Sequence, residues 1–552
     1  MKRVVISLLL AFFCQSFLHA AVEEKAITRR LDEELAPIIQ KDLSRFNLPG
    51  MSIAVICDGK TIWAKGFGYA DREKRVPATP ETVYRVGSLS KLFNATAVML
   101  MQEQQRLSID EGIKRYLPRA NFVYPFGDES AKITLRHILS HRAGTTRECP
   151  VGHYFDDSEP SPKETAVSLF GTTLVYPPGA KTKYSNSAIG VCGYILEKTV
   201  GMEYSTFQKN YILQPLGMAS SSFTKQESFG ERLAKGYMRN LNGDQWEAPD
   251  FRFGYISAAN LYSTVTDMAK FIDVMCNQGR PLLKPESFRE MTTVQFEPKD
   301  VTQGFGLGFE LSRVHNERTL GHLGAVYGFS SSILVMPDGK LGAVSLVNLD
   351  GCEGINNKYI HFALGIALEE ITGRRLLHIP SATELPASKL KRLAGRYQRG
   401  EAVAWLTVKK GSLCYEPPGG TRRQLTALSE NEFITDDYFG YGQEISIVRQ
   451  EEKVAGIKIN DAFYIRTEEE GFPWQNLIGE YGPDYNITQV YEKDGKLTVL
   501  VEWFYEYTLK HVEGLRFAYP FGLYHGEEVR FIESEGRIQA LEFSGAVFKR
   551  RG

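Results

Sequence analysis

The C-terminal part of the chain repeats itself. Gly-Arg-Tyr at 395–397 returns as Gly-Glu-Tyr at 479–481, an offset of 84 residues, and the register then holds without a gap. The further matched pairs are Gly411/Gly495, Leu413/Leu497, Leu425/Leu509, Phe433/Phe517, Val448/Ile532 and Ile457/Leu541. A register shared over most of a unit indicates two copies of one structure. Short strands and frequent turns in units of about 80 residues favour two small β-barrels, because closure removes exposed strand edges.

The chain before this repeat has a different texture. Helical spacing over 26–46 is followed by two strand-like runs, and long helical stretches occupy the middle. Strand-like runs return at 330–336 and 342–348, before a final helix at 359–371. Strands at both ends with helices between them predict a mixed domain built on an antiparallel sheet. The predicted layout is a first domain at 24–376, a linker at 377–390, and barrels at 391–470 and 475–552.

The first 20 residues are predicted to be a secretory signal peptide. Lys2 and Arg3 precede an apolar run over 4–17, and small residues follow at Ala20 and Ala21. The run is shorter than the ~20 residues of a spanning helix, so a membrane anchor is the less favoured alternative. Export to the periplasm or to the medium is therefore expected. No later segment is apolar enough to span a bilayer.

Composition excludes several classes of function. The net charge of the 552 residues is −1, and no basic run indicates a nucleic acid or an anionic membrane as partner. Of the seven cysteines, the six beyond the predicted cleavage site are sparse and lack C-x-x-C spacing. They indicate buried thiols rather than a disulfide framework or a zinc site. No motif calls for a metal or a cofactor.

One of three Ser-x-x-Lys motifs stands out as a candidate nucleophile. Ser88 and Lys91 follow a glycine and open an apolar segment without Pro or Gly until Gly112, which predicts a buried helix. Residues three apart share a helix face, so the lysine can reach the serine hydroxyl. Serine attacks only when a base takes its proton, and lysine serves when burial lowers its pKa. The look-alikes at 222–225 and 388–391 are expected to be solvated.

Two further motifs supply groups that such a serine needs. Tyr184 and Asn186 follow a Pro-Pro-Gly turn, so a tyrosinate held by Lys91 can relay a proton while the amide orients the lysine and the substrate. His322 and Gly324 precede a strand hairpin, and the glycine lets a substrate lie close to the strand. The N–H groups of Ala325 and of the serine are then a candidate oxyanion hole.

In combination, GSLSK, YSN and HLG resemble the motifs of the class C β-lactamase and penicillin-binding-protein-like serine hydrolase family. The stretches ITLRHILSHRAGT, YPPGAKTKYSNSAIGVCGYILEK, ILQPLGM and LGHLGAVYGFSSSILVMPDGKLGAVSLVN agree with it. The resemblance implies an α+β fold of the β-lactamase/transpeptidase type, with Ser88 as the acylated nucleophile and Lys91 and Tyr184 as its acid/base partners. It places Asn186, His322 and Gly324 in substrate binding.

The chain departs from the lactamase pattern at one position. His322 stands where many lactamases carry the lysine of K-T-G, and a largely neutral imidazole binds a substrate carboxylate less well. This favours peptidase or esterase chemistry over efficient β-lactam hydrolysis.

With two lipocalin-like barrels, the architecture resembles bacterial D-aminopeptidase, in which a barrel loop narrows the active site. Segments 436–442 and 519–526 are candidates for such a loop; the alternative is that the barrels are spacers.

The sequence thus predicts an exported serine hydrolase that works through an acyl-Ser88 intermediate on small amides, D-amino-acid peptides or esters. D-Aminopeptidase, DD-peptidase and esterase activities are all compatible with it. The alternative is a penicillin-binding or cell-wall-ligand sensor with slow or no turnover, whose barrels capture an apolar or cell-wall ligand. Expected partners are a small molecule, a short peptide or cell-wall fragments, and the oligomeric state is left open.

Overall fold

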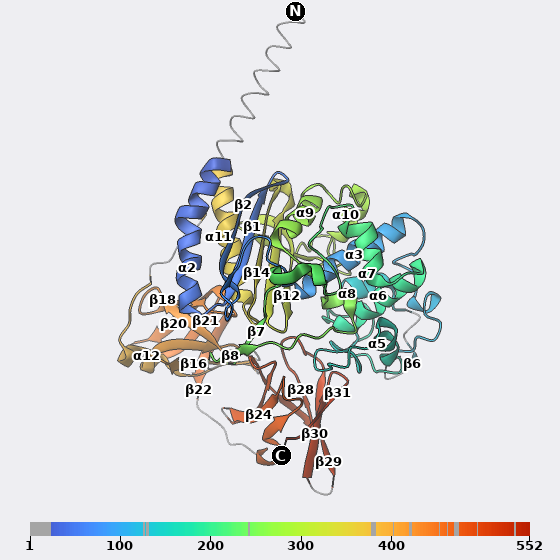
Figure 1. Ribbon diagram of the computed structural model, residues 1–552. Helices are drawn as coiled ribbons and strands as arrows, with labels where there is room; N and C mark the ends of the chain where they lie inside the picture. The colour runs from blue at the N-terminus through green and yellow to red at the C-terminus, as the bar shows by residue number, and fades with distance from the viewer. Residues whose placement is uncertain are drawn as a thin grey trace, which may run out of the picture.

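The computed structural model describes residues 24–124, 127–128, 132–240, 243–376, 382–400, 402–418, 422–451, 453–460, 462–467, 474–493, 495–534 and 537–551. The predicted signal peptide at 1–20 and part of the predicted linker lie outside these residues. Three bodies are visible in Figure 1: a large mixed domain, a first β unit in orange and a second in red. In the part of the chain that is described, no helix combines the length and apolarity needed to cross a membrane.

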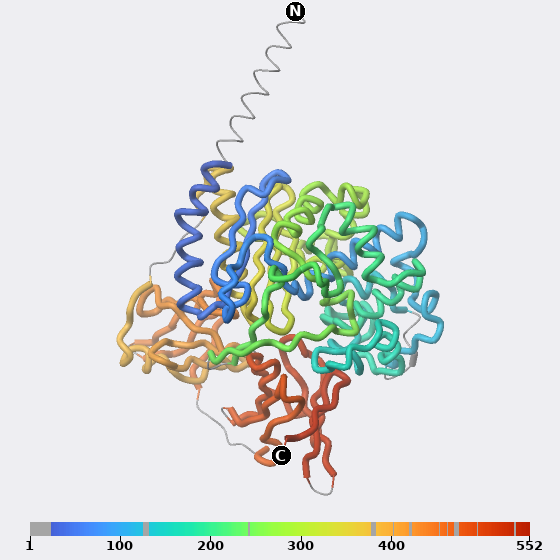
Figure 2. The backbone as a smooth tube through the Cα atoms, viewed as in Figure 1, coloured from blue at the N-terminus to red at the C-terminus, as the bar shows by residue number. Residues whose placement is uncertain are grey.

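An eight-stranded antiparallel sheet forms the centre of the first domain, as the strand-like runs predict. Its order is β10-β11-β12-β13-β14-β1-β2-β3. The two ends of the domain meet in this sheet, where Met51 pairs with Val347 and Cys57 with Leu341 (Figure 2). Its strands are β10 (Gly304–Phe305), β11 (Glu310–Val314), β12 (Glu317–Val326), β13 (Phe329–Met336), β14 (Leu341–Val347), β1 (Gly50–Cys57), β2 (Lys60–Asp71) and β3 (Val76–Pro77).

Helices cover both faces of this sheet, which explains why β1 is buried along nearly its whole length and is apolar except at Ser52. Ile53 and Val55 pack with η1 (Leu31–Leu35), α2 (Ala36–Arg45) and α11 (Glu353–Thr372). Ala54 and Ile56 belong instead to the core formed with α3 (Ser90–Glu103) and α9 (Val265–Cys276). Successive side chains of a strand point to opposite faces. Each fully buried aliphatic side chain contributes about 1.5–3 kcal/mol by leaving water.

Shorter elements surround α3 and complete the domain (Figure 1). They include α6, whose N-terminus carries a residue of the YSN motif. The remaining helices are α4 (Leu135–Leu139), α5 (Pro162–Ser168), α6 (Asn186–Val200), α7 (Tyr204–Gln208), α8 (Ile256–Ala259) and α10 (Pro285–Met291), with η2 (Gly87–Leu89), η3 (Ile113–Arg115), η4 (Lys209–Leu213), η5 (Glu227–Arg232) and η6 (Pro337–Gly339). The two-stranded pairs are β4 (Tyr84–Arg85) with β9 (Tyr262–Ser263), β5 (Val123–Tyr124) with β6 (Gly127–Asp128), and β7 (Tyr237–Arg239) with β8 (Gln245–Glu247).

The first β unit is a closed eight-stranded barrel, as predicted. Its first and last strands pair through Tyr397 and Arg466. Helix α12 (Ala387–Leu393) spans the predicted boundary near residue 390, and its leucines enter the barrel core. The strands are β15 (Gly395–Arg399), β16 (Ala402–Lys409), β17 (Ser412–Glu416), β18 (Arg423–Ala427), β19 (Glu432–Asp436), β20 (Tyr441–Gln450), β21 (Lys453–Ile459) and β22 (Ala462–Thr467).

The second β unit is all-β, but its strands divide into two sheets. One sheet has the order β23-β24-β25-β26 and the other β27-β28-β29-β30-β31. A single bridge between Tyr481 and Arg550 links the start of the unit to its end. The elements are η7 (Gln475–Leu477), β23 (Gly479–Tyr481), β24 (Thr488–Lys493), β25 (Lys496–Val501), β26 (Tyr505–Thr508), β27 (Lys510–Glu513), β28 (Arg516–Ala518), β29 (Glu528–Ser534), β30 (Arg537–Phe543) and β31 (Ala546–Lys549).

The sequence repeat has a structural counterpart in two equivalent bonding patterns. The Tyr397 hydroxyl donates to the Leu393 carbonyl at 2.5 Å, and the Tyr481 hydroxyl donates to the Leu477 carbonyl at 2.9 Å. Near the end of each unit, an arginine hydrogen-bonds to the backbone just before the unit's first strand. Arg466 and Arg550 donate through Nη2 to the carbonyls of Ala394 (2.6 Å) and Ile478 (2.7 Å). Every one of these pairs is related by the 84-residue offset.

The two loops that the sequence singles out lie in different places. Segment 436–442 packs behind the sheet, where Asp436 pairs with Arg45 at 2.6 Å and with Lys358 at 3.0 Å. Segment 519–526 of the second β unit reaches the first domain near Tyr184 instead: the Leu523 carbonyl accepts a hydrogen bond from Lys183 Nζ at 3.0 Å. The six cysteines of the described chain are free thiols, and five of them are buried.

Candidate active site

Ser88 lies in the 3₁₀ turn η2 that leads into α3, and Lys91 lies in the first turn of that helix. The preceding Gly87 has φ +53°, and a Cβ there would come within 2.8 Å of the Ala325 nitrogen, so the tight turn requires glycine. Lys91 Nζ donates to Ser88 Oγ at 2.8 Å. The i, i+3 spacing therefore brings the two side chains together as predicted from the motif.

Lys91 is buried and held by three acceptors. Besides the serine, Nζ donates to Asn186 Oδ1 at 2.8 Å and to the Ala258 carbonyl at 2.9 Å. Burial, together with the charge of Arg147, lowers the pKa of Lys91 well below its usual range. In its neutral form Nζ has two N–H groups for Asn186 and Ala258 and a lone pair that accepts from the Ser88 hydroxyl, which is the arrangement that a general base requires.

Tyr184 completes the contacts to the nucleophile. Its hydroxyl donates to Ser88 Oγ at 2.9 Å, and its ring lies 5.0 Å from Lys91 Nζ. Burial raises the pKa of Tyr184 above its usual range, although the hydrogen bond to the serine opposes this. The resting side chain is thus a phenol. The tyrosinate expected from the sequence does not fit this environment, because too little charge surrounds the oxygen to offset its desolvation.

Asn186 is oriented by a buried pair that sequence motifs do not reveal. Its Nδ2 donates to Glu148 Oε1 at 2.8 Å, which leaves Oδ1 to face Lys91. Arg147 Nη1 donates to the same Glu148 oxygen at 2.6 Å. Ser185 caps the helix above by accepting from the Ala188 N–H at 3.0 Å. The cap and the carboxylate together fix the amide.

The third motif lies on β12, against the backbone of the nucleophile. A Cβ on Gly324 would come within 2.3 Å of the Val86 carbonyl and 3.3 Å of the Ser88 nitrogen. Ala325 follows on the same strand, and its nitrogen faces Gly87. The structure therefore brings the backbone nitrogen of Ala325 on β12 close to η2, which holds Ser88. An oxyanion hole formed by these two N–H groups is expected there.

His322 is a buried, neutral imidazole that lines the same cavity. Its Nδ1 lies 2.5 Å from the Leu323 carbonyl, and since a carbonyl only accepts, the proton is on Nδ1. Burial and then the charge of Lys91 lower the pKa of His322 to about 4. Among the described residues Nε2 has no hydrogen-bond partner. This nitrogen can accept a hydrogen bond from a donor group of a substrate, but the uncharged ring cannot neutralise a substrate carboxylate.

A cavity of about 250 Å³ opens in front of Ser88, and part of its lining, here called the acidic wall, carries three carboxyl groups. Glu310, Glu353 and Glu502 line it, with Arg147 as the cation. Burial raises the pKa of Glu502 to about 7, although Arg147 opposes the shift. Burial also raises the pKa of Glu353, whose Oε1 accepts from the Tyr505 hydroxyl at 3.1 Å.

The second β unit builds part of this wall. Glu502, Tyr505 and Leu523 line the cavity, although they lie far from Ser88 in the chain. Behind them, the Arg147 backbone N–H donates to Glu527 Oε1 at 2.9 Å. The sequence indicates segment 519–526 as a candidate loop, but it gives no sign of Arg147, Glu148, Glu353 or Glu502. None of these residues belongs to a local motif, so only the packing of the two units reveals them.

The fold and this constellation define a β-lactamase-type serine hydrolase site. The family model described as Beta-lactamase matches residues 35–364, and the chain belongs to that family. The chain is similar to "Protein flp" of Staphylococcus aureus (strain MRSA252), with 24% identity over 326 residues, 59% of this chain and 64% of the relative. The match thus spans less than two thirds of that relative's length.

Solved structures share the fold. The octameric penicillin-binding protein homologue from Pyrococcus abyssi aligns with a TM-score of 0.57 at 24% identity, covering 86% of this chain and 99% of that one. The D-amino acid amidase from Ochrobactrum anthropi SV3, complexed with L-phenylalanine amide, aligns with a TM-score of 0.50 at 23% identity. That alignment covers 64% of this chain and 99% of the amidase.

Proposed function

We propose that the protein hydrolyses small amides or esters through an acyl-Ser88 intermediate. The observation that carries the proposal is the pair of hydrogen bonds at Ser88 Oγ, one shared with Lys91 Nζ at 2.8 Å and one from the Tyr184 hydroxyl at 2.9 Å. A buried amine with a lowered pKa is the base that such a nucleophile requires.

In this mechanism Ser88 Oγ attacks the substrate carbonyl carbon while Lys91 takes the hydroxyl proton. The oxyanion lies between the N–H groups of Ser88 and Ala325, each worth about 3–4 kcal/mol. Tyr184 gives its proton to the leaving nitrogen or oxygen and regains one from the Lys91 ammonium. Water then attacks the acyl-Ser88 ester with the proton transfers reversed, which restores the free serine and releases the acid.

We infer further that the substrate carries a free ammonium group. Three carboxylates and one guanidinium line the cavity, so an ammonium improves the charge balance and a carboxylate worsens it. The unpartnered Nε2 of His322 likewise accepts from a donor. Aminoacyl amides, aminoacyl esters and short peptides with a free amino end fit these walls. The D-amino acid amidase among the structural neighbours supports testing D-aminoacyl amides first.

The test is one panel of substrates run on wild type and Ser88→Ala. It contains D- and L-aminoacyl amides, their N-acetyl counterparts, short-chain esters and a chromogenic cephalosporin. We expect turnover of the free-amine compounds, at least tenfold slower turnover of the acetylated ones, and none with Ser88→Ala. A burst of product without turnover would indicate a slow acyl-enzyme sensor instead. Equal rates with and without the ammonium would show that the acidic wall does not take part in substrate recognition.

We also propose that the chain is exported, on the strength of Lys2, Arg3 and the apolar run at 4–17. N-terminal sequencing of the protein recovered outside the cytoplasm tests this. A mature end close to Ala20 or Ala21 is the expected result. Retention of Met1 on an intracellular protein would contradict it.

A further inference from the structure

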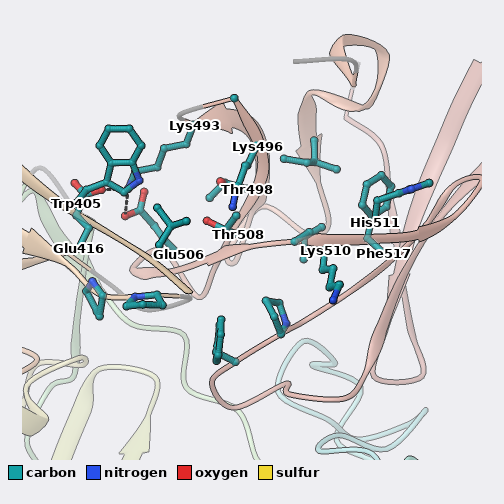
Figure 3. Close-up of a pocket in the computed structure, with 18 of the residues that line it drawn as sticks. Trp405, Glu416, Lys493, Lys496, Thr498, Glu506, Thr508, Lys510, His511 and Phe517 are labelled. Carbon is teal, nitrogen blue, oxygen red and sulfur yellow. Dashed lines mark hydrogen bonds and ion pairs between the residues drawn. The ribbon is translucent and has the colours of Figure 1, made fainter. Parts of the chain in front are cut away.

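A second cavity lies where the two β units meet, apart from the site around Ser88. It measures about 440 Å³ and is walled by β15, β16 and β17 of the first unit and by β24 to β28 of the second (Figure 3). A volume of this size falls within the ~300–1,000 Å³ typical of small-molecule sites. Among the described residues, no side chain lines both this cavity and the cavity at Ser88.

The floor of this cavity carries charges of both signs. Lys493 Nζ lies 2.7 Å from Glu416 Oε2 of the first unit and 2.9 Å from Glu506 Oε2 of the second. Both glutamates are buried, and the Tyr491 hydroxyl donates to Glu506. Lys510 also lines the cavity. The floor therefore offers hydrogen-bond acceptors and donors side by side.

Thr498 supplies an observation that is independent of these charges. It lies directly across from Thr508 on the neighbouring strand, beside Lys496 (Figure 3), and is 1% exposed. Its hydroxyl has no hydrogen-bond partner among the described residues. A buried hydroxyl without a partner costs about 1–3 kcal/mol, so an unpaired one that lines a cavity points to a ligand.

Aromatic side chains stand at both ends of the floor. Trp405 lies at one end, beside Glu416, and His511 and Phe517 lie at the other (Figure 3). Trp474 packs against this second group, with its ring centroid 4.7 Å from that of His511, tilted, and 5.1 Å from that of Phe517, edge-on. Flat apolar faces thus flank a strip of polar groups.

We propose that this inter-unit cavity binds a saccharide. A sugar ring has an apolar C–H face that packs on an indole, and hydroxyl groups that both donate and accept along its rim. The sugar hydroxyls can donate to Glu416 and Glu506 and accept from Lys493. They can also pair with the hydroxyl of Thr498. An apolar ligand would bury the ion pairs without hydrogen bonds. Arg396, Lys496 and Lys510 add positive charge to the lining, so the phosphate arm of the test below separates an anion from a sugar.

The two cavities share a strand, although they share no side chain. On β26, Tyr505 lines the cavity at Ser88 and the next residue, Glu506, lines the inter-unit cavity. Adjacent strand residues point to opposite faces, so one strand forms a wall of each. The proposed binding site thus goes beyond the hydrolase activity and does not depend on it.

The test uses the full chain and follows tryptophan fluorescence and heat of binding. The probes are β-linked N-acetylglucosamine trimer, cellotriose and maltotriose, with a tri-alanine peptide and inorganic phosphate as separate arms. We expect at least one trisaccharide to bind with a Kd below about 10 mM. Binding of the peptide or of phosphate alone, or no signal with any sugar, would overturn it.

Variants separate ligand contact from damage to the fold. Trp405→Ala is expected to weaken sugar binding about tenfold, and Thr498→Val about threefold or more through the lost hydrogen bond. Thr498→Val keeps the shape of the side chain and removes an unpaired hydroxyl, so Tm should stay unchanged or rise. Trp246→Phe, at a tryptophan that packs on Trp503 outside this cavity, is the matched control. Unchanged sugar affinity in both cavity variants would contradict the assignment.

Discussion

Lys183 Nζ and Glu527 Oε1 lie 2.5 Å apart, with side chains that are 3% and 2% exposed. The lysine immediately precedes Tyr184, and the glutamate follows the loop of the second β unit that reaches the active site. A buried ion pair thus anchors the segment that carries Tyr184 to the second β unit.

The first prediction concerns this pair. Glu527→Gln leaves the Lys183 ammonium buried without its counter-charge, which typically costs about 3–5 kcal/mol. We expect a lower Tm and a lower kcat, measured by thermal unfolding and by turnover of an aminoacyl amide. The neighbouring Glu528→Gln is the control, because its partner Arg516 is half exposed and such pairs contribute at most about 1 kcal/mol. Equal effects of the two substitutions would contradict the anchor.

The second prediction identifies the nucleophile. Ser88→Ala removes the atom that Lys91 and Tyr184 contact, so turnover should fall by roughly four to six orders of magnitude. Covalent labelling by a serine-reactive fluorophosphonate should disappear with it, as read by mass spectrometry. Ser222→Ala, in the look-alike motif, should leave both unchanged. Labelling that persists in Ser88→Ala would refute the assignment.

The third prediction is a pH dependence. Glu502, with a pKa of about 7, is mostly neutral below that pH and charged above it. For an ammonium substrate, KM should therefore fall as pH rises through 7, and Glu502→Gln should remove this change. The N-acetyl counterpart of the substrate should show no such step in KM. A step that survives in Glu502→Gln would assign the titration to another group.

Lys91 adds a second pH dependence, this time in kcat/KM. The lysine acts as a base only when neutral, so kcat/KM should rise with pH through its lowered pKa for every substrate. This rise should remain in Glu502→Gln. His322, with a pKa of about 4, should contribute no step near its usual value of 6.5.

The fourth prediction concerns His322→Lys. An ammonium in place of the neutral imidazole should attract a substrate carboxylate, so acylation by a carboxylate-bearing cephalosporin should rise about tenfold. The rate with an aminoacyl amide should fall, because two ammonium groups then share the cavity. Stopped-flow acylation rates measure both, with His322→Gln as the uncharged control. Acylation rates that stay flat or fall would exclude this role.

The fifth prediction uses the close approach of β12 to the nucleophile. A Cβ on Gly324 would meet Ser331 Oγ at 2.2 Å and the Val86 carbonyl at 2.3 Å, so Gly324→Ala must shift the strand from Ser88. We expect at least a hundredfold loss of kcat, since oxyanion donors act only within about 0.5 Å of their proper place. Gly339→Ala, whose new Cβ has its nearest neighbour at 4.0 Å, should retain activity.

Much of the fold could be predicted from local patterns, because these patterns follow directly from backbone geometry. The i, i+3 spacing of Ser88 and Lys91 needs only a helix, and the doubly buried β1 needs only alternation of its side chains. The 84-residue repeat likewise predicts two related units whatever their contacts. The division of the second unit into two sheets did not follow, since hydrogen-bond pairing depends on strand register across the whole unit.

The chemistry of the site was decided by tertiary contacts. The sequence alone determined which serine, lysine, tyrosine and histidine can act together, through their motifs and order. It could not show that the lysine is desolvated, since burial depends on every element packed around it. Nor could it place Glu502 and Glu527 beside the first domain. Interactions between residues hundreds of positions apart leave no periodic trace in a chain, so only the docking of the second β unit reveals the acidic wall.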